Sequence, residues 1–145
     1  MQFLPVIFST SNKLSSHLIR LFDCGHCDFS HVGIITKCGE FVIESTAKNG
    51  VSLTHIKDFK SRASKFKEGF FPCVDPSASY NLAYDQLGKK YDYAGALGLG
   101  LPFIGRKWDD AERWFCSELL AHCSQIFPKH HAKSIGVSAC YILTR

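Results

Sequence analysis

The sequence predicts a single α+β domain over residues 1–145, in which an antiparallel sheet packs against helices. Two observations support this: strand-length apolar runs recur in the first half of the chain, and helical spacing of apolar residues dominates the second half. The chain has 145 residues, of which 46% are hydrophobic and 21% charged, so it can bury one core. No internal repeat is visible, and we expect no second domain.

The strands and helices of the first half follow from apolar runs and turn signals. Residues 3–8 are apolar and end in a polar Ser-Thr-Ser-Asn segment, which predicts a buried strand followed by a helix cap. Residues 31–36 and 41–45 predict a hairpin around the turn at 37–40. The other elements expected here are a helix through Leu14, Leu18 and Leu21, a strand at 51–53 after the Asn49-Gly50 turn, and a helix at 55–62.

The second half of the sequence is mainly helical. Residues 66–74 predict one more strand, and residues 77–88 and 114–127 carry apolar residues at helical spacing. The glycine-rich stretch at 95–105, which also contains Pro102, is expected to be a loop or a broken helix. The apolar tail at 135–143 predicts a strand that closes the sheet.

Composition limits the partners and the location of the protein. The longest uncharged apolar stretch, residues 94–104, is too short to span a bilayer, so we expect no transmembrane segment. The first residues lack the features of a secretory signal, which predicts a cytoplasmic protein. Seven cysteines are an odd number and are expected to be reduced thiols. A net charge of +4 is mild, and we expect no nucleic-acid partner.

The predicted hairpin places a histidine and a carboxylate on one face of the sheet. If Thr36 lies opposite Phe41, the numbers of paired residues sum to 77, so Gly33 faces Glu44. His31 then lies diagonally from Glu44, roughly 7–8 Å away, a gap that two polar side chains can close. The opposite face is expected to face the core with Val32, Ile34, Phe41 and Ile43.

A cysteine later in the chain completes a possible catalytic set. A cysteine hydrolase needs a thiolate, a base that works near neutral pH and a group that fixes the base's tautomer. Cys116, His31 and Glu44 could fill these roles. A thiol at the start of a helix gains from the exposed backbone N–H groups. A helix capped by Asp109 and beginning near Asp110 would instead bury Cys116 mid-helix.

Three segments together resemble a known enzyme family. They are Ser-His-Val-Gly-Ile at 30–34, Val-Ile-Glu-Ser at 42–45 with Gly-Val at 50–51, and Phe-Cys-Ser-Glu-Leu-Leu at 115–120. Their order resembles that of the circularly permuted papain-like hydrolases, the YiiX-like branch of the NlpC-type superfamily. In that family the histidine strand comes first, the third polar residue lies on the next strand, and the nucleophilic cysteine opens a later helix.

The resemblance implies a papain-like fold and an amidase, peptidase or acyl-transfer activity through a thioester. It implies a triad of Cys116, His31 and Glu44, no metal and no organic cofactor. Lys-Tyr-Asp-Tyr at 90–93 is similar to the family's aromatic segment, which makes Tyr91 a candidate to line the pocket or support an oxyanion. Peptide amides and acyl esters are both possible substrates, and the family suggests a bacterial or phage origin.

Other functions remain open at this point. Cys24-Gly25-His26-Cys27 is similar to the motif of disulfide isomerases and would support thiol-disulfide exchange. The same residues with Cys38 could bind zinc, although a second pair with finger-like spacing is missing. The domain could also keep the fold as a peptide-binding or acyl-binding module without catalysis. Cys116 taken alone could be a core residue.

Overall fold

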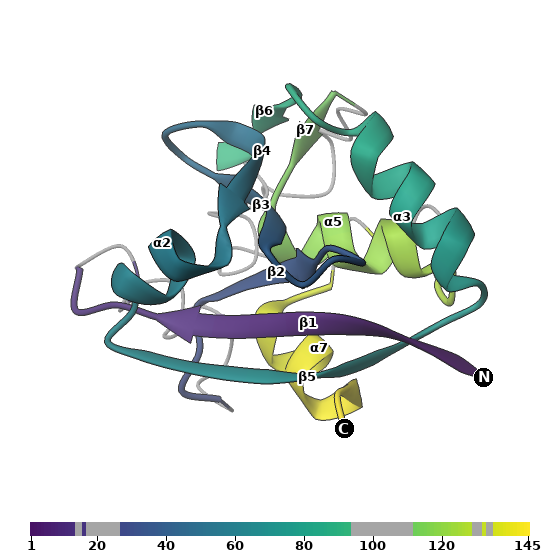
Figure 1. Ribbon diagram of the computed structural model, residues 1–145, viewed down its shortest axis with the longest axis horizontal. Helices are drawn as coiled ribbons and strands as arrows, with labels where there is room; N and C mark the ends of the chain where they lie inside the picture. Colours follow the sequence, from purple (N-terminus) through teal and green to yellow (C-terminus); the bar gives the residue numbers. More distant parts are fainter. Residues whose placement is uncertain (14–15, 17–26, 94–111, 129–131, 133–134) are drawn as a thin grey trace, which may run out of the picture.

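The computed structural model describes residues 1–13, 16, 27–93, 112–128, 132 and 135–145 (Figure 1). The predicted helix through Leu14, Leu18 and Leu21 and the predicted loop or broken helix at 95–105 lie outside these residues. No helix among the described residues is long and apolar enough to cross a membrane.

The centre of the fold is a five-stranded antiparallel sheet with the order β4-β3-β2-β1-β5. The strand predictions for this part of the chain are confirmed. Figure 1 shows β1 and β5 running side by side along the length of the molecule. The strands are β1 (Gln2–Thr10), β2 (His31–Ile35), β3 (Phe41–Thr46), β4 (Gly50–His55) and β5 (Lys65–Cys73).

Four helices and a small second sheet complete the described structure. The helices are α2 (Ile56–Ser61), α3 (Pro76–Asp85), α5 (Cys116–Ser124) and α7 (Val137–Leu143). The second sheet pairs β6 (Lys90–Tyr91) with β7 (Arg113–Trp114) in parallel. This pair places Tyr91 beside Trp114, two residues before Cys116.

The prediction of a strand at 135–143 is wrong, because the chain forms helix α7 there. An apolar run of this length fits a strand or a buried helix equally well. Val137 and Cys140 are buried and three residues apart, which suits one face of a helix packed on β5 and α5. Strand-like pairing follows the helix instead, where Arg145 and Phe70 exchange two backbone hydrogen bonds.

Apolar side chains form a core on each face of the sheet. Helices α3, α5 and α7 pack on one face, where Val6, Phe8 and Ile34 are buried. Helix α2 packs on the other face and buries Phe59 against Ile7, Ile35 and Val42. Successive strand residues point to opposite faces, so the alternation in β1 serves both cores.

The predicted hairpin register is confirmed. Ile34 pairs with Ile43 and Ile35 pairs with Val42, so the paired numbers sum to 77. A Cβ at Gly33 would collide with Cγ1 of Val42 and lie 3.5 Å from Cβ of Glu44, so the close approach of β2 and β3 requires glycine there.

The core prediction for Phe41 is wrong. Phe41 is half-buried. Its ring packs against the His55 ring on β4 in a T-shaped arrangement, with 5.4 Å between the ring centroids. Because Phe41 is the first residue of β3, it lies beside the turn, and its cross-strand partner covers it instead of a helix.

Candidate functional site

The histidine and the carboxylate predicted from the hairpin are in direct contact. His31 begins β2, and its Nε2 lies 2.6 Å from Oε2 of Glu44 on β3. The Glu44 side chain is only 1% exposed, whereas that of His31 is 22% exposed. With Nε2 occupied by the carboxylate, Nδ1 is the ring nitrogen left for a second partner.

Two further residues hold Glu44 in place, and the sequence analysis missed both. Oε1 of Glu44 accepts hydrogen bonds from Oγ1 of Thr54 at 2.6 Å and from the Arg62 guanidinium at 2.5 Å. The Asn49-Gly50 turn could have identified Thr54, because it sets the β3–β4 register in which Glu44 faces Ser52. Arg62 caps the end of α2 and was hidden in a basic stretch.

The contacts give His31 and Glu44 the charges of an ion pair. Burial alone would lower the pKa of His31, but the adjacent Cys116 and Glu44 raise it to about 10. Burial alone would raise the pKa of Glu44, but His31, Thr54 and Arg62 lower it to about 2. Near neutral pH, the imidazole is therefore an imidazolium and the carboxyl is ionised.

Cys116 is the first residue of α5, and Phe115 is its N-cap. The preceding residues Arg113 and Trp114 form β7, which excludes the longer helix from Asp110. Cys116 lies close to the imidazole and is one of the two neighbours that raise the pKa of His31. Cys116 is buried and opens α5, where the first backbone N–H groups of a helix have no acceptor within the helix.

Buried polar contacts fix the position of this helix start. Oε2 of Glu118 accepts a hydrogen bond from the backbone N–H of Phe115 at 3.1 Å. Oγ of Ser45 on β3 donates to the carbonyl of Trp114 at 2.7 Å. The strand that carries Glu44 is thus bonded directly to the segment that leads to Cys116.

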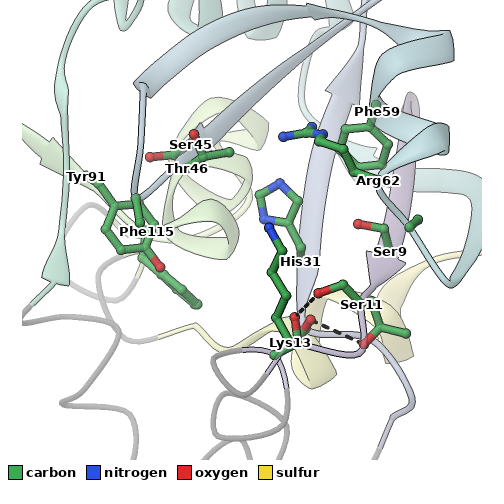
Figure 2. Close-up of a pocket in the computed structure, with 15 residues that line it drawn as sticks. Ser9, Ser11, Lys13, His31, Ser45, Thr46, Phe59, Arg62, Tyr91 and Phe115 are labelled. Atoms are coloured by element: carbon green, nitrogen blue, oxygen red, sulfur yellow. Dashed lines mark hydrogen bonds between the residues drawn. The ribbon is translucent and has the colours of Figure 1, made fainter.

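A cavity of about 210 Å³ opens beside His31. Figure 2 shows His31 at its centre, with Tyr91 and Phe115 on one side and Phe59 and Arg62 on the other. Burial, and then the nearby Cys116, raise the pKa of Tyr91, so its hydroxyl keeps its proton at neutral pH. Tyr91, which the sequence made a candidate to line a substrate pocket or support an oxyanion, is one of the residues that line this cavity.

The cysteines weighed for zinc do not share one site in the described part of the chain. Cys24 and His26 lie outside the described residues. Cys27 precedes β2, and its thiol donates a hydrogen bond to the carbonyl of Phe29. Cys38 lies in the turn beyond the other end of β2. A five-residue strand is about 16 Å long, which is too far for two ligands of one ion.

Comparison with known proteins finds a likeness in fold. No protein-family model and no curated protein matches the chain. Among solved structures, the chain is similar to the crystal structure of the metalloprotein yiiX from Escherichia coli O157:H7 (DUF1105). The TM-score is 0.61 over 86% of this chain and 64% of that one, with 23% sequence identity. The chain has a YiiX-like fold.

The YiiX-like fold does not by itself bring a metal site to this chain. Among residues 1–13, 16, 27–93, 112–128, 132 and 135–145, no three His, Cys, Asp or Glu side chains gather in a way that could hold a metal ion. Both oxygens of Glu44 already accept hydrogen bonds from His31, Thr54 and Arg62. The donor set at the cavity therefore does not fit a metal centre.

Proposed function

We propose that the protein is a cysteine hydrolase or acyltransferase of the circularly permuted papain-like type. In this proposal Cys116 is the nucleophile, His31 the general acid and base, and Glu44 the group that orients His31. One observation carries it: a cysteine at the start of a helix lies beside an imidazole whose Nε2 is held by a buried carboxylate.

The reaction would begin with the thiolate of Cys116 and the imidazolium of His31. The sulfur attacks the acyl carbon of an amide or ester, and a tetrahedral intermediate forms. Its C–N or C–O bond then breaks as the imidazolium gives its proton to the leaving group, which leaves a thioester on Cys116. Neutral His31 next takes a proton from water or another nucleophile, whose attack on the thioester releases the acyl product and the thiolate.

The oxyanion of the intermediate would be held by groups already fixed in position. Backbone N–H groups at the start of α5 are oriented by the N-terminal turn of the helix, which the Glu118 carboxylate fastens to Phe115. Tyr91 lines the cavity beside His31, and we propose its protonated hydroxyl as a second donor to the oxyanion. Glu44, held by Arg62 and Thr54, keeps the imidazole ring from turning.

The test is a pH series of alkylation with iodoacetamide, with mass-spectrometric assignment of each labelled cysteine. We expect rapid labelling of Cys116 that remains rapid below pH 7, because imidazolium at His31 stabilises the thiolate. Cys38 is exposed, and its hydrogen bond with Thr36 lowers its pKa, so it will also react. The series therefore uses a Cys38→Ser background, which removes a competing thiol far from the cavity.

Two variants supply the control and the contrary outcome. In His31→Ala, labelling of Cys116 should slow by about tenfold or more at pH 6. Lys37→Ala, in the exposed turn between β2 and β3, should leave it unchanged. Slow labelling of Cys116 that is indifferent to His31 would refute the proposal. Dominant labelling within 24–27 would favour thiol-disulfide exchange, and unreactive cysteines throughout would favour the binding module.

A further inference from the structure

A second cavity adjoins the one that contains His31. It has a volume of about 320 Å³ and lies between the turn that joins β3 to β4, the start of β6 and Arg113 of β7. Ala47 and Tyr91 line both cavities. The two cavities therefore adjoin at these residues, and we call them together the groove. Arg62 and His31 line one cavity, and Lys48 and Lys90 line the other.

Among the described residues that line this groove, the charged side chains are all basic. They are Lys13, Lys48, Arg62, Lys89, Lys90 and Arg113. Arg62 is paired with the buried Glu44 and Lys89 with the exposed Glu112, and neither carboxylate is among the residues that line the groove. A cleft lined by one sign of charge concentrates ligands of the other sign.

Lys48 and Lys90 supply positive charge at the far end of the groove. Both are exposed, and neither forms an ion pair with any described residue. Lys90 pairs with Arg113 across β6 and β7, and Arg113 lies three residues before Cys116. Three extended residues span about 10 Å, which sets the scale of the distance from the sulfur to this basic end.

We propose that the substrate of this site is an anionic amide or ester, with a negatively charged group about 10 Å from the reacting acyl carbon. The inference rests on the proposed function of Cys116. The acyl group lies between Cys116 and Tyr91, and the negative group lies against Lys48 and Lys90. The basic end of the groove thus selects substrates by charge, while the residues around His31 perform the reaction.

The experiment compares two thiol probes that differ only in charge. N-iodoacetyl-6-aminohexanoate carries a carboxylate at a distance comparable to that between the sulfur and the lysines, and its carboxamide has the same length without the charge. The measured quantity is the ratio of their labelling rates at Cys116 in low salt, in the Cys38→Ser background. Coulomb's law for exposed charges predicts a loss of about threefold in this ratio for each lysine removed.

We expect the ratio to exceed one in the parent protein and to fall about tenfold in Lys48→Gln with Lys90→Gln. The matched control, Lys37→Gln with Lys57→Gln, changes the net charge equally at exposed sites outside the groove and should preserve the ratio. Salt should reduce the ratio in the parent protein toward one, because it screens all the exposed charges of the groove.

The outcomes separate this inference from the proposed function. If the neutral probe labels Cys116 in a manner that depends on His31, but the ratio is the same in all variants, substrate selection by the groove is refuted and the nucleophile stands. If neither probe labels Cys116, the proposed function fails, and the inference fails with it.

Discussion

Glu44 connects more of the candidate site than any other single residue described here. It accepts hydrogen bonds from His31 on β2, Thr54 on β4 and Arg62 at the end of α2. A buried carboxylate needs such partners, because an unpaired buried charge is strongly destabilising. The same three donors keep it ionised, so orientation of the imidazole and stability of the sheet depend on one carboxylate.

This dependence predicts an acid-sensitive part of the stability. The pKa of Glu44 is about 2, below its ordinary value of 4.5, so its contribution is complete above pH 4.5 and is lost as the pH falls toward 2. We expect Glu44→Gln to be less stable than the parent at pH 7, with a smaller difference at pH 3. Urea unfolding at the two pH values measures this.

The matched control for this prediction is Glu68→Gln. Glu68 also forms an ion pair, with Lys60, but its side chain is 50% exposed, so its loss should change stability by less than about 1 kcal/mol. A difference between Glu44→Gln and the parent that stays constant from pH 7 to pH 3 would show that the carboxylate charge does not stabilise the fold.

At this scale, the sequence predicted some contacts of the site and missed others. His31 and Glu44 could be paired because they lie on one hairpin, whose turn determines the register. Arg62 could not be assigned, because its partner lies 18 residues earlier and the contact depends on how α2 packs on the sheet. The bond from Ser45 to Trp114 spans 69 residues and leaves no local pattern in the sequence.

Among the secondary-structure elements, the β2–β3 hairpin determines the geometry of the base. Its two strands approach so closely that only hydrogen fits at the side-chain position of Gly33. This close approach brings His31 and Glu44 together from diagonal positions. A larger residue at 33 must therefore separate the strands that carry the pair.

We expect Gly33→Ala to destabilise the protein by about 1–3 kcal/mol, the usual cost of overpacking a core. It should also slow the labelling of Cys116, because His31 and Glu44 move apart. Thermal unfolding and the alkylation assay measure the two effects. Because the nearest atom is a side-chain methyl of Val42, the double variant Gly33→Ala with Val42→Ala should recover part of the stability. If the double variant is no more stable than Gly33→Ala, the clash is with a group other than Val42.

The elements themselves were predictable where a long apolar or alternating run was bounded by turn residues, as in β1 and β3. The tail was assigned the wrong type, since a short apolar run does not distinguish strand from helix. The pairing of β6 with β7 was missed, because two-residue strands carry no pattern and depend on contacts between distant segments.

Across the whole molecule, one buried hydrogen bond joins the sheet to the segment that leads into α5. Ser45 on β3 donates to the Trp114 carbonyl, which also accepts from the backbone N–H of Asp92. This bond links the half of the chain that carries His31 and Glu44 to the half that carries Cys116. The relative position of His31 and Cys116 therefore depends in part on this bond.

We expect Ser45→Ala to cost about 1 kcal/mol of stability, because the carbonyl keeps its second donor. The labelling of Cys116 should slow more than this loss suggests, by about tenfold, since a small displacement of reacting groups has a large effect on rate. Ser61→Ala is the control, because its exposed hydroxyl bonds only to Asp58 within α2. If labelling of Cys116 slows equally in Ser45→Ala and Ser61→Ala, the bond from Ser45 to Trp114 does not control the position of Cys116.

The distribution of these residues along the chain also affects how the protein matures. The hairpin that pairs His31 with Glu44 is local and is synthesised before Cys116, which follows much later in the chain. A nascent chain can therefore form the acid–base pair before it contains the thiol. Under the proposed function, the reactivity of Cys116 arises only when α5 docks, so an incomplete or misfolded chain would carry Cys116 as an ordinary thiol and not modify its neighbours.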